Sequence, residues 1–283
     1  FNVLFILGLC AMIMPLRVDS QLVRMDVPIM IGVSILGFVL CLDGSIGRMD
    51  GLILASGAIG YTVFTVIKSR RETKAIKAEF DQEYAVVNDH SAKTVAWNFF
   101  LLLVGLVLLV TGARMFVNSA ITIAEALGVS QLVIGLTIVA AGTSLPEVAT
   151  SVVATIRGER DIAIGNVVGS NIFNILSVLG FTAAVSPINV QASALQVDLP
   201  VMMGVAIICL PIFFTGLLIL RWEGAVFFGL YILYTVYLIL NSSGSPSLPT
   251  YSKVVGLGVL PVVALLILGT AIYEVRHKPQ KAA

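Results

Sequence analysis

The sequence predicts an all-α polytopic membrane protein, on three observations. Hydrophobic residues make up 58% of the 283 residues and charged residues only 12%, about half the charged fraction of a soluble domain. The mean hydropathy is +1.01. Several apolar runs reach the roughly 20 residues that a helix needs to cross a bilayer, and they are continuous rather than alternating. Because a helix satisfies its own backbone hydrogen bonds, helices are expected for these runs.

The apolar runs divide the chain into expected helices and one long polar stretch. The expected helices are residues 1–16, 27–42, 51–67, 95–117, 131–156, 162–185, 199–220, 222–240 and 251–273. The polar stretch, residues 68–94, is predicted to be a solvated cytoplasmic connector, with a regulatory site as the alternative. In that orientation only Arg48 and Lys253 among the loop lysines and arginines fall outside, which agrees with the positive-inside rule.

The chain repeats itself at a long fixed offset. The run FNVLFILGLCAMIMPL begins at Phe1 and FNILSVLGFTAAVSPI begins at Phe173, an offset of 172 residues. After a one-residue insertion the pairing continues, with Arg48 opposite Arg221. Similarity at a constant long offset indicates an internal duplication.

The duplication predicts two inverted five-helix repeats. Residues 95–240 are expected to be a complete second repeat (helices 6–10), and five helices is an odd number, so the two copies enter the membrane from opposite sides. Residues 1–67 are then interpreted as the remnant of a truncated first repeat, from the end of helix 3 through helix 5. The first repeat is expected to begin about 78 residues before Phe1. Residues 251–273 are one additional C-terminal transmembrane helix.

Glu147 is the acidic residue set deep in a predicted span, within GLTIVAAGTSLPEVATS. A charged side chain at the bilayer centre costs at least about 2.5 kcal/mol, so Glu147 is a functional candidate. Pro146 lacks a backbone N–H and is expected to break the helix, which is tolerated where the backbone lines a cavity. The Glu147 carboxylate and the Thr143 and Ser144 hydroxyls are hard oxygen ligands suited to Ca²⁺ and Na⁺. Neutralisation by Arg114 is the alternative.

The next span carries a facing polar stripe within GNVVGSNIFN. Asn166, Ser170, Asn174 and Ser177 are spaced four, four and three residues apart, so they share one helical face. Asn171 lies off this stripe and is expected to bond a neighbouring helix. Hydrogen bonding between helices is the alternative to ion binding for such residues.

Other polar residues are interpreted as structural. Ser151 and Thr155 are expected to bond between helices. Asp26 and Asp198 each stand two residues before a proline at the start of a span, so they are interpreted as helix N-caps. The sequence has no HExxH, P-loop or GxSxG motif, so no enzyme activity is expected.

These motifs resemble those of the calcium/cation antiporter superfamily, specifically bacterial sodium/calcium exchanger-like membrane proteins. The resemblance is carried by GLTIVAAGTSLPEVATS and IGNVVGSNIFN in the second repeat and by FNVLFILG in the first, and it runs from Phe1 to about Leu240. It implies the ten-helix exchanger fold, to which residues 251–273 are extra. It implies an ion site formed by Thr143, Ser144, Glu147, Asn166 and Ser170. Asn166 stands where some members carry an acid, which bears on the choice of ion.

The resemblance further implies a secondary antiporter in a bacterial inner membrane. It implies Ca²⁺ exchanged against Na⁺ or H⁺, with the lipid bilayer as surroundings, no cofactor beyond the transported ions and no nucleic acid. A monovalent cation/proton antiporter of the same fold and a non-transporting truncated fragment are the alternatives. The coupling ion and the oligomeric state stay open.

One carboxylate leaves a divalent ion undercompensated, because Ca²⁺ takes six to eight oxygen ligands. A second acidic motif like GTSxPE is therefore expected from the inverted repeat, with its glutamate about 26 residues before Phe1.

Overall fold

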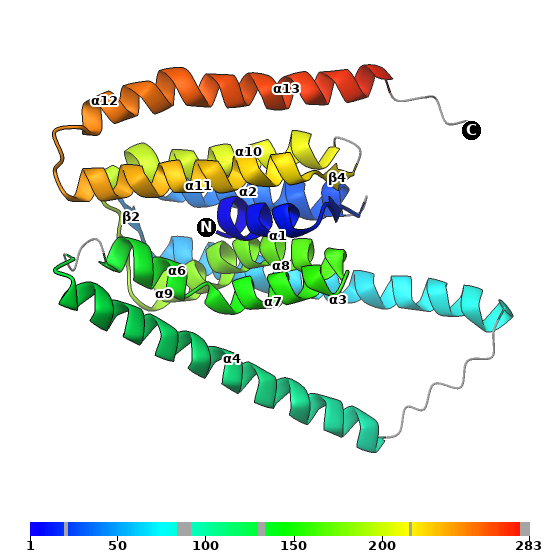
Figure 1. Cartoon of the computed structure of the whole chain (residues 1–283). Helices are drawn as coiled ribbons and strands as arrows, with labels where there is room; N and C mark the ends of the chain where they lie inside the picture. The colour runs from blue at the N-terminus through cyan, green and yellow to red at the C-terminus, as the bar shows by residue number, and fades with distance from the viewer. Residues whose placement is uncertain (20–21, 84–91, 130–133, 215–216, 278–283) are drawn as a thin grey trace.

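The computed structural model of the protein describes residues 1–19, 22–83, 92–129, 134–214 and 217–277 and is built almost entirely of helices (Figure 1). The helices are η1 (Asn2–Leu7), α1 (Gly8–Ile13), η2 (Leu22–Asp26), α2 (Val27–Leu40), α3 (Arg48–Glu83), α4 (Ala92–Ala126), η3 (Gly135–Val139), α6 (Ala140–Gly142), α7 (Leu145–Ile156), α8 (Arg160–Phe173), η4 (Asn174–Leu179), α9 (Gly180–Val185), η5 (Ala194–Asp198), α10 (Leu199–Phe214), α11 (Arg221–Ser242), α12 (Leu248–Lys253), η6 (Val254–Val259) and α13 (Leu260–His277), where η marks a π-helical turn. The strands are β1 (Leu16–Arg17), β2 (Ser45–Ile46), β3 (Ile188–Asn189) and β4 (Leu218–Ile219).

Within these described ranges, 7 continuous helical stretches are long and apolar enough to cross a membrane. They are Leu22–Leu40, Arg48–Arg70, Lys93–Ala126, Arg160–Val185, Ala194–Phe213, Arg221–Ser242 and Leu248–Thr270. Two shorter apolar helices, Asn2–Ile13 and Leu145–Ile156, accompany them. The protein is therefore a multi-pass membrane protein, as its composition predicts.

Two helices are longer than the sequence predicts. α4 has 35 residues and runs to Ala126 instead of ending at residue 117, and α3 has 36 residues and continues to Glu83. At about 1.5 Å per residue, each exceeds the roughly 30 Å hydrocarbon core. Hydropathy marks only the part of a helix that lies in lipid, whereas polar residues continue the helix outside it. Part of the predicted connector 68–94 is thus helical, and its residues 84–91 lie outside the described chain.

The short strands show that the two copies are inverted. By the repeat offset, β1 is equivalent to β3, and β2 is equivalent to β4. β1 pairs with β4, and β2 pairs with β3, both antiparallel. In Figure 1, β4 and β2 lie at opposite ends of the helical bundle. Equivalent strands therefore lie at opposite ends, which confirms the predicted inverted repeats.

Two helix crossings repeat the same symmetry. α1 packs against α11, and the equivalent α9 packs against α3. Both crossings depend on glycine: a Cβ added to Gly224 would lie 2.7 Å from the Ala11 Cβ, and one added to Gly180 would lie 2.7 Å from the Ala55 nitrogen. Small residues allow transmembrane helix backbones to approach closely. The crossings thus join each copy to the other.

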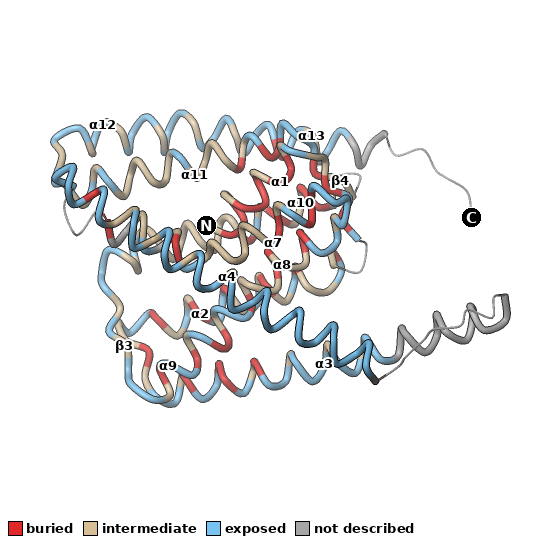
Figure 2. Tube along the Cα trace, turned by 60° about the horizontal axis from the view of Figure 1, so that its bottom comes forward, coloured by how far each residue is buried: buried red, intermediate tan, exposed pale blue. Residues whose placement is uncertain are grey.

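The buried core lies where the two copies meet. Figure 2 shows buried residues concentrated along α1, α8 and α10 in the middle of the bundle, with α4 exposed. The additional C-terminal helix packs on the outside: Ile267 is buried against the bundle, and the Tyr251 hydroxyl donates a 2.7 Å hydrogen bond to the Leu233 carbonyl of α11. The core therefore belongs to the repeats, with α13 as a peripheral layer.

Asp26 and Asp198 are not helix N-caps, contrary to the prediction. The π-helical turns η2 and η5 precede α2 and α10 without interruption, so each aspartate lies inside a longer helix. Asp26 has helical angles (φ −72°, ψ −38°) and makes no capping hydrogen bond. Instead, Asp26 accepts a 3.3 Å hydrogen bond from the Tyr61 hydroxyl, and Asp198 accepts a 2.7 Å bond from the equivalent Tyr234. The pairs tie α2 to α3 and α10 to α11.

The glycine at the α1–α11 crossing gives a direct test of this packing. We expect Gly224→Ala to lower the free energy of unfolding by about 1–3 kcal/mol, because the added methyl overlaps the α1 backbone. Gly229→Ala, on the same helix, has no atom within 4 Å of the added methyl and should be neutral or stabilising by up to about 1 kcal/mol. Thermal unfolding in detergent measures both, and equal effects would contradict the crossing.

Candidate ion-binding site

The predicted helix break is present between α6 and α7. α6 ends at Gly142, Thr143 and Ser144 form a turn, and α7 begins at Leu145 with Pro146 in its first turn. Ser144 has φ −101° and ψ 8°, outside helical geometry, and its N–H donates to the Ala141 carbonyl at 3.1 Å. The break therefore follows from the proline, whose missing N–H and ring end the preceding helix.

A tight contact with α4 holds the break in place. A Cβ on Gly142 would overlap the Val117 side chain of α4. Glycine is therefore required where the broken helix passes α4. The backbone of the turn is set both by Pro146 from within the helix and by Val117 from outside.

Glu147 lies in the first turn of α7, directly after the break. Its Oε2 atom is buried and has no hydrogen-bond partner among the described residues. Arg114 therefore makes no hydrogen bond to this oxygen. An unpaired buried carboxylate oxygen is unfavourable, which makes Glu147 the candidate ligand for a cation.

Asn166 joins α8 to α7 at the backbone of the residue that carries this carboxylate. Its Nδ2 atom donates to the Glu147 backbone carbonyl at 3.2 Å and to the Ser151 hydroxyl oxygen at 2.9 Å. Ser151 is fully buried, and the Thr155 hydroxyl donates to its carbonyl at 2.7 Å. Since the Asn166 amide nitrogen is engaged on α7, its Oδ1 atom is the one free to bind a cation. The structure thus brings Glu147, Asn166 and Ser151 together.

The other predicted ligands lie close to this group but less enclosed. Thr143 is exposed and Ser144 is half-buried in the turn that precedes Glu147. Ser170 is half-buried on α8, one helical turn beyond Asn166. Their roles as ligands stay predictions.

The other polar residues of this segment differ in their surroundings. Asn174 is exposed and Ser177 is buried. Asn171 donates to the Met30 sulfur of α2 at 3.5 Å, so it contacts a neighbouring helix as predicted. The polar residues of this segment therefore differ in burial, and Asn171, off the stripe, bonds α2.

Asn2 is a polar residue that the sequence reasoning missed. Its side chain is 6% exposed, and its helix η1 packs against both α7 and α8. Asn2 is the first-repeat equivalent of Asn174 by the offset of 172. The internal repeat could have identified Asn2, because a polar residue in one copy predicts that the equivalent position in the other copy is also worth examining.

The donor atoms favour a hard cation over a transition metal. The described residues contain no group of three or more His, Cys, Asp and Glu that could hold a metal. A cation at Glu147 would be held by one carboxylate and by neutral amide, hydroxyl and carbonyl oxygens. Oxygen ligands of this kind suit alkali and alkaline-earth cations.

Inverted repeats that meet around a broken helix are an architecture found in many secondary transporters. Residues 1–67 and 97–240 match the sodium/calcium exchanger protein family. The chain belongs to this family.

Individual relatives agree with the family. The inner membrane protein YrbG of Escherichia coli (strain K12) is 36% identical over 208 residues, which cover 73% of this chain and 63% of YrbG. The sodium/calcium exchanger MaX1 of Methanosarcina acetivorans is 42% identical over 143 residues, covering 50% of this chain and 41% of MaX1. The chain thus spans less than two thirds of the length of these relatives.

A solved structure shows the same fold. The sodium-calcium exchanger NCX_Mj superimposes with a TM-score of 0.65 at 31% sequence identity, covering 82% of this chain and 71% of that chain. The likeness extends over most of both chains and confirms the exchanger-like fold that the motifs predict.

Cation-dependent stability tests the role of Glu147. A ligand that binds only the folded state at 100 times its dissociation constant stabilises it by about 2.7 kcal/mol, so we expect Ca²⁺ to raise the unfolding temperature in detergent. Glu147→Gln should abolish this rise and should be more stable than the parent in chelator, because the buried charge is gone.

The matched control is Glu159→Gln, an exposed glutamate before α8. It should retain the full response to Ca²⁺. An undiminished response in Glu147→Gln would place the ion elsewhere.

Proposed function

We propose that this chain is part of a secondary antiporter that exchanges Ca²⁺ against Na⁺ or H⁺. In this proposal the ion binds at mid-membrane to Thr143, Ser144, Glu147, Asn166 and Ser170. The observation that carries the proposal is the buried Oε2 atom of Glu147, which has no hydrogen-bond partner in the described chain. The similarity to MaX1 and NCX_Mj, both named sodium/calcium exchangers, supports Ca²⁺ and Na⁺ as the ions.

Charge balance requires a second contribution to this site. Ca²⁺ takes six to eight oxygens and carries two charges, whereas Glu147 supplies one. We place the missing acid in the first repeat, at the equivalent of Glu147, since inverted repeats bind substrate at their interface. Residues 1–67 are the end of that repeat in this proposal, and residues 95–240 are the complete second repeat.

The single carboxylate also motivates a second candidate function, antiport of monovalent cations only. The single positive charge of Na⁺ is balanced by the carboxylate of Glu147 without a second acid. Uptake measurements separate the two functions, because only the first moves Ca²⁺.

We propose the inner membrane of a bacterium as the location. The similarity to YrbG, which is named an inner membrane protein of Escherichia coli, supports this location. No nucleic-acid partner is part of the proposal.

Ion flux in vesicles tests the proposed exchange. The protein that carries this sequence, reconstituted in vesicles, should take up radioactive Ca²⁺ under an imposed Na⁺ or pH gradient. We expect Glu147→Gln to reduce this uptake to background, because the amide removes the negative charge that balances the ion, while Glu159→Gln retains it. Gradient-driven Na⁺ flux without Ca²⁺ uptake would favour the monovalent antiporter.

Asn166→Asp tests the contribution of α8 to the choice of ion. The new carboxylate cannot donate to the Glu147 carbonyl and Ser151 hydroxyl, so we expect ion-free stability to fall by about 1–3 kcal/mol. Its added charge should make Ca²⁺ stabilise the variant more than it stabilises the parent. Asn189→Asp, at the exposed position of β3, is the control. It should change neither the ion-free stability nor the stabilisation by Ca²⁺. Weaker Ca²⁺ stabilisation of Asn166→Asp would remove Asn166 from the site.

A further inference from the structure

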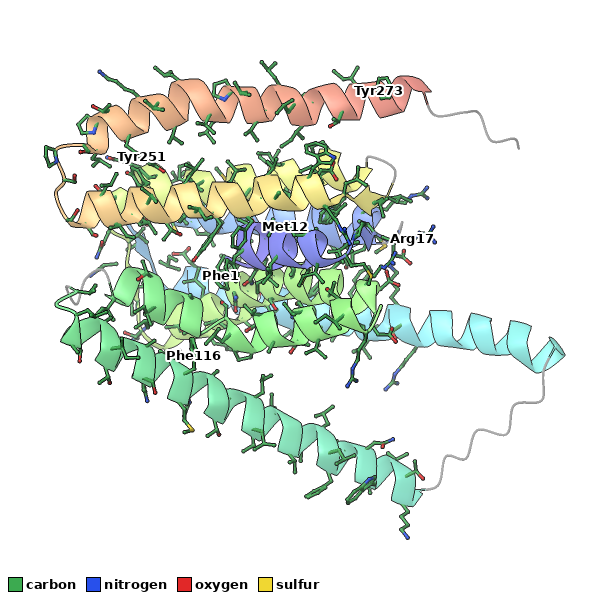
Figure 3. All side chains as sticks on the ribbon, in the orientation of Figure 1. Phe1, Met12, Arg17, Phe116, Tyr251 and Tyr273 are labelled. Carbon is green, nitrogen blue, oxygen red and sulfur yellow. The ribbon has the colours of Figure 1, made fainter. Side chains whose placement is uncertain are left out.

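Each pair of short strands joins one repeat to the other. β1 and β2 belong to the first copy, whereas β3 and β4 belong to the second, and the pairs are β1 with β4 and β2 with β3. By the repeat offset the two pairs are equivalent, and the register of pairing is the same in both. They lie at opposite ends of the bundle, and Figure 3 labels Arg17 of β1 at the β1–β4 end.

One further hydrogen bond extends each strand pair. Next to the β1–β4 pair, the Val18 N–H donates to the Leu217 carbonyl at 2.8 Å. Next to the β2–β3 pair, the Val190 N–H donates to the Gly44 carbonyl at 2.9 Å. Val18 corresponds to Val190 at the offset of 172, and Gly44 corresponds to Leu217 after the one-residue insertion. The same hydrogen bond is therefore made at both ends of the bundle.

The two residues that accept these bonds share a left-handed backbone conformation. Gly44 has φ +85°, and Leu217 has φ +53°. Leu217 is the one residue other than glycine with a positive φ in the part of the chain that the structure describes. The left-handed conformation is unfavourable for a residue with a Cβ, which crowds the following carbonyl oxygen, and glycine avoids this cost. The β1–β4 pair therefore carries backbone strain at a position where the β2–β3 pair has none.

The two strand pairs also pack against different parts of the core. Leu16 and Ile219 of the β1–β4 pair are buried in the main hydrophobic core, and the half-buried Leu217 side chain packs against this core. Ile46 of the β2–β3 pair is instead buried in a small separate cluster. Packing of the leucine side chain offsets the strain of its backbone. At Gly44 there is no strain to offset, and a Cβ added there would meet no atom within 4 Å.

We propose that Leu217 is a latch that makes the closure of the β1–β4 end depend on the packing of the main core. When the leucine side chain leaves the core, the strained backbone has no compensation and the β1–β4 pair releases. The β2–β3 pair has no such dependence, because Gly44 is unstrained and carries no side chain. The orientation predicted from the lysines and arginines places the β1–β4 end in the cytoplasm.

The consequence for transport rests on the proposed function. An antiporter of inverted repeats opens alternately to the two sides of the membrane. Exact symmetry between the repeats would give both ends the same condition for opening. Leucine in one copy and glycine in the other remove this equality, so that rearrangement of the core releases the β1–β4 end in preference to the β2–β3 end.

Hydrogen exchange at the two equivalent amides tests the latch. In the protein in detergent, exchange of the Val18 and Val190 amides reports local opening of the β1–β4 and β2–β3 pairs. Leu217→Ala and Leu217→Gly both remove the leucine packing, but only alanine keeps a Cβ. We expect the Val18 amide to exchange about fivefold faster in Leu217→Ala than in Leu217→Gly, with the Val190 amide unchanged in both.

Gly44→Ala is the reciprocal variant, and it keeps the proposal testable if the Leu217 variants do not fold. It adds strain without packing, so the Val190 amide should exchange about fivefold faster while the Val18 amide is unchanged. Gly158→Ala is the matched control, because Gly158 has φ +83° and also has no atom within 4 Å of an added Cβ. It should leave the Val190 amide unchanged.

Three results would overturn the proposal. Equal exchange of the Val18 amide in Leu217→Ala and Leu217→Gly would show that the backbone strain does not act on the strand pair. Unchanged exchange of the Val190 amide in Gly44→Ala would show the same at the other end. Equal acceleration of both amides by Leu217→Ala would indicate a general loss of stability instead of a local release. The measurement needs neither an ion nor flux, so its failure is distinct from failure of the proposed exchange.

Discussion

The buried carboxylate of Glu147 is the constraint on which the rest of the site depends. A charge at the bilayer centre costs at least about 2.5 kcal/mol, and the Oε2 atom has no donor among the described residues to offset that cost. The backbone around it is arranged accordingly. Pro146 ends one helix just before Glu147, and Asn166 binds the carbonyl of the same residue from α8. The proposed cation site rests on this unpaired oxygen.

The repeat symmetry gives this site a rigid frame. Glycine-mediated crossings join α1 to α11 and α9 to α3, so the two repeats are packed against each other as well as within themselves. The aspartate–tyrosine pairs add a polar link between neighbouring helices in both copies. The core formed in this way lies beside the broken helix. The aspartates and tyrosines of these pairs can therefore lie between the helices with their hydrogen bonds made.

Departures from the symmetry are where the two halves acquire different chemistry. Ser34 corresponds to Ala206, and Tyr231 corresponds to Ala58, so equivalent positions differ in polarity between the two copies. Polar groups at these positions are therefore present in one copy and absent from the other, although the backbone is built from equivalent elements.

The sequence alone determined the membrane-spanning helices, the duplication, the break at Pro146 and the candidacy of Glu147. Each depends on a local property, namely hydropathy, a constant offset, a missing N–H or a charge in an apolar run. Tertiary structure decided what no local pattern contains. It paired Asp26 and Asp198 with distant tyrosines instead of helix ends, turned Asn166 toward Ser151, and left the Oε2 atom of Glu147 without a hydrogen-bond partner among the described residues, because such contacts depend on which helices pack side by side.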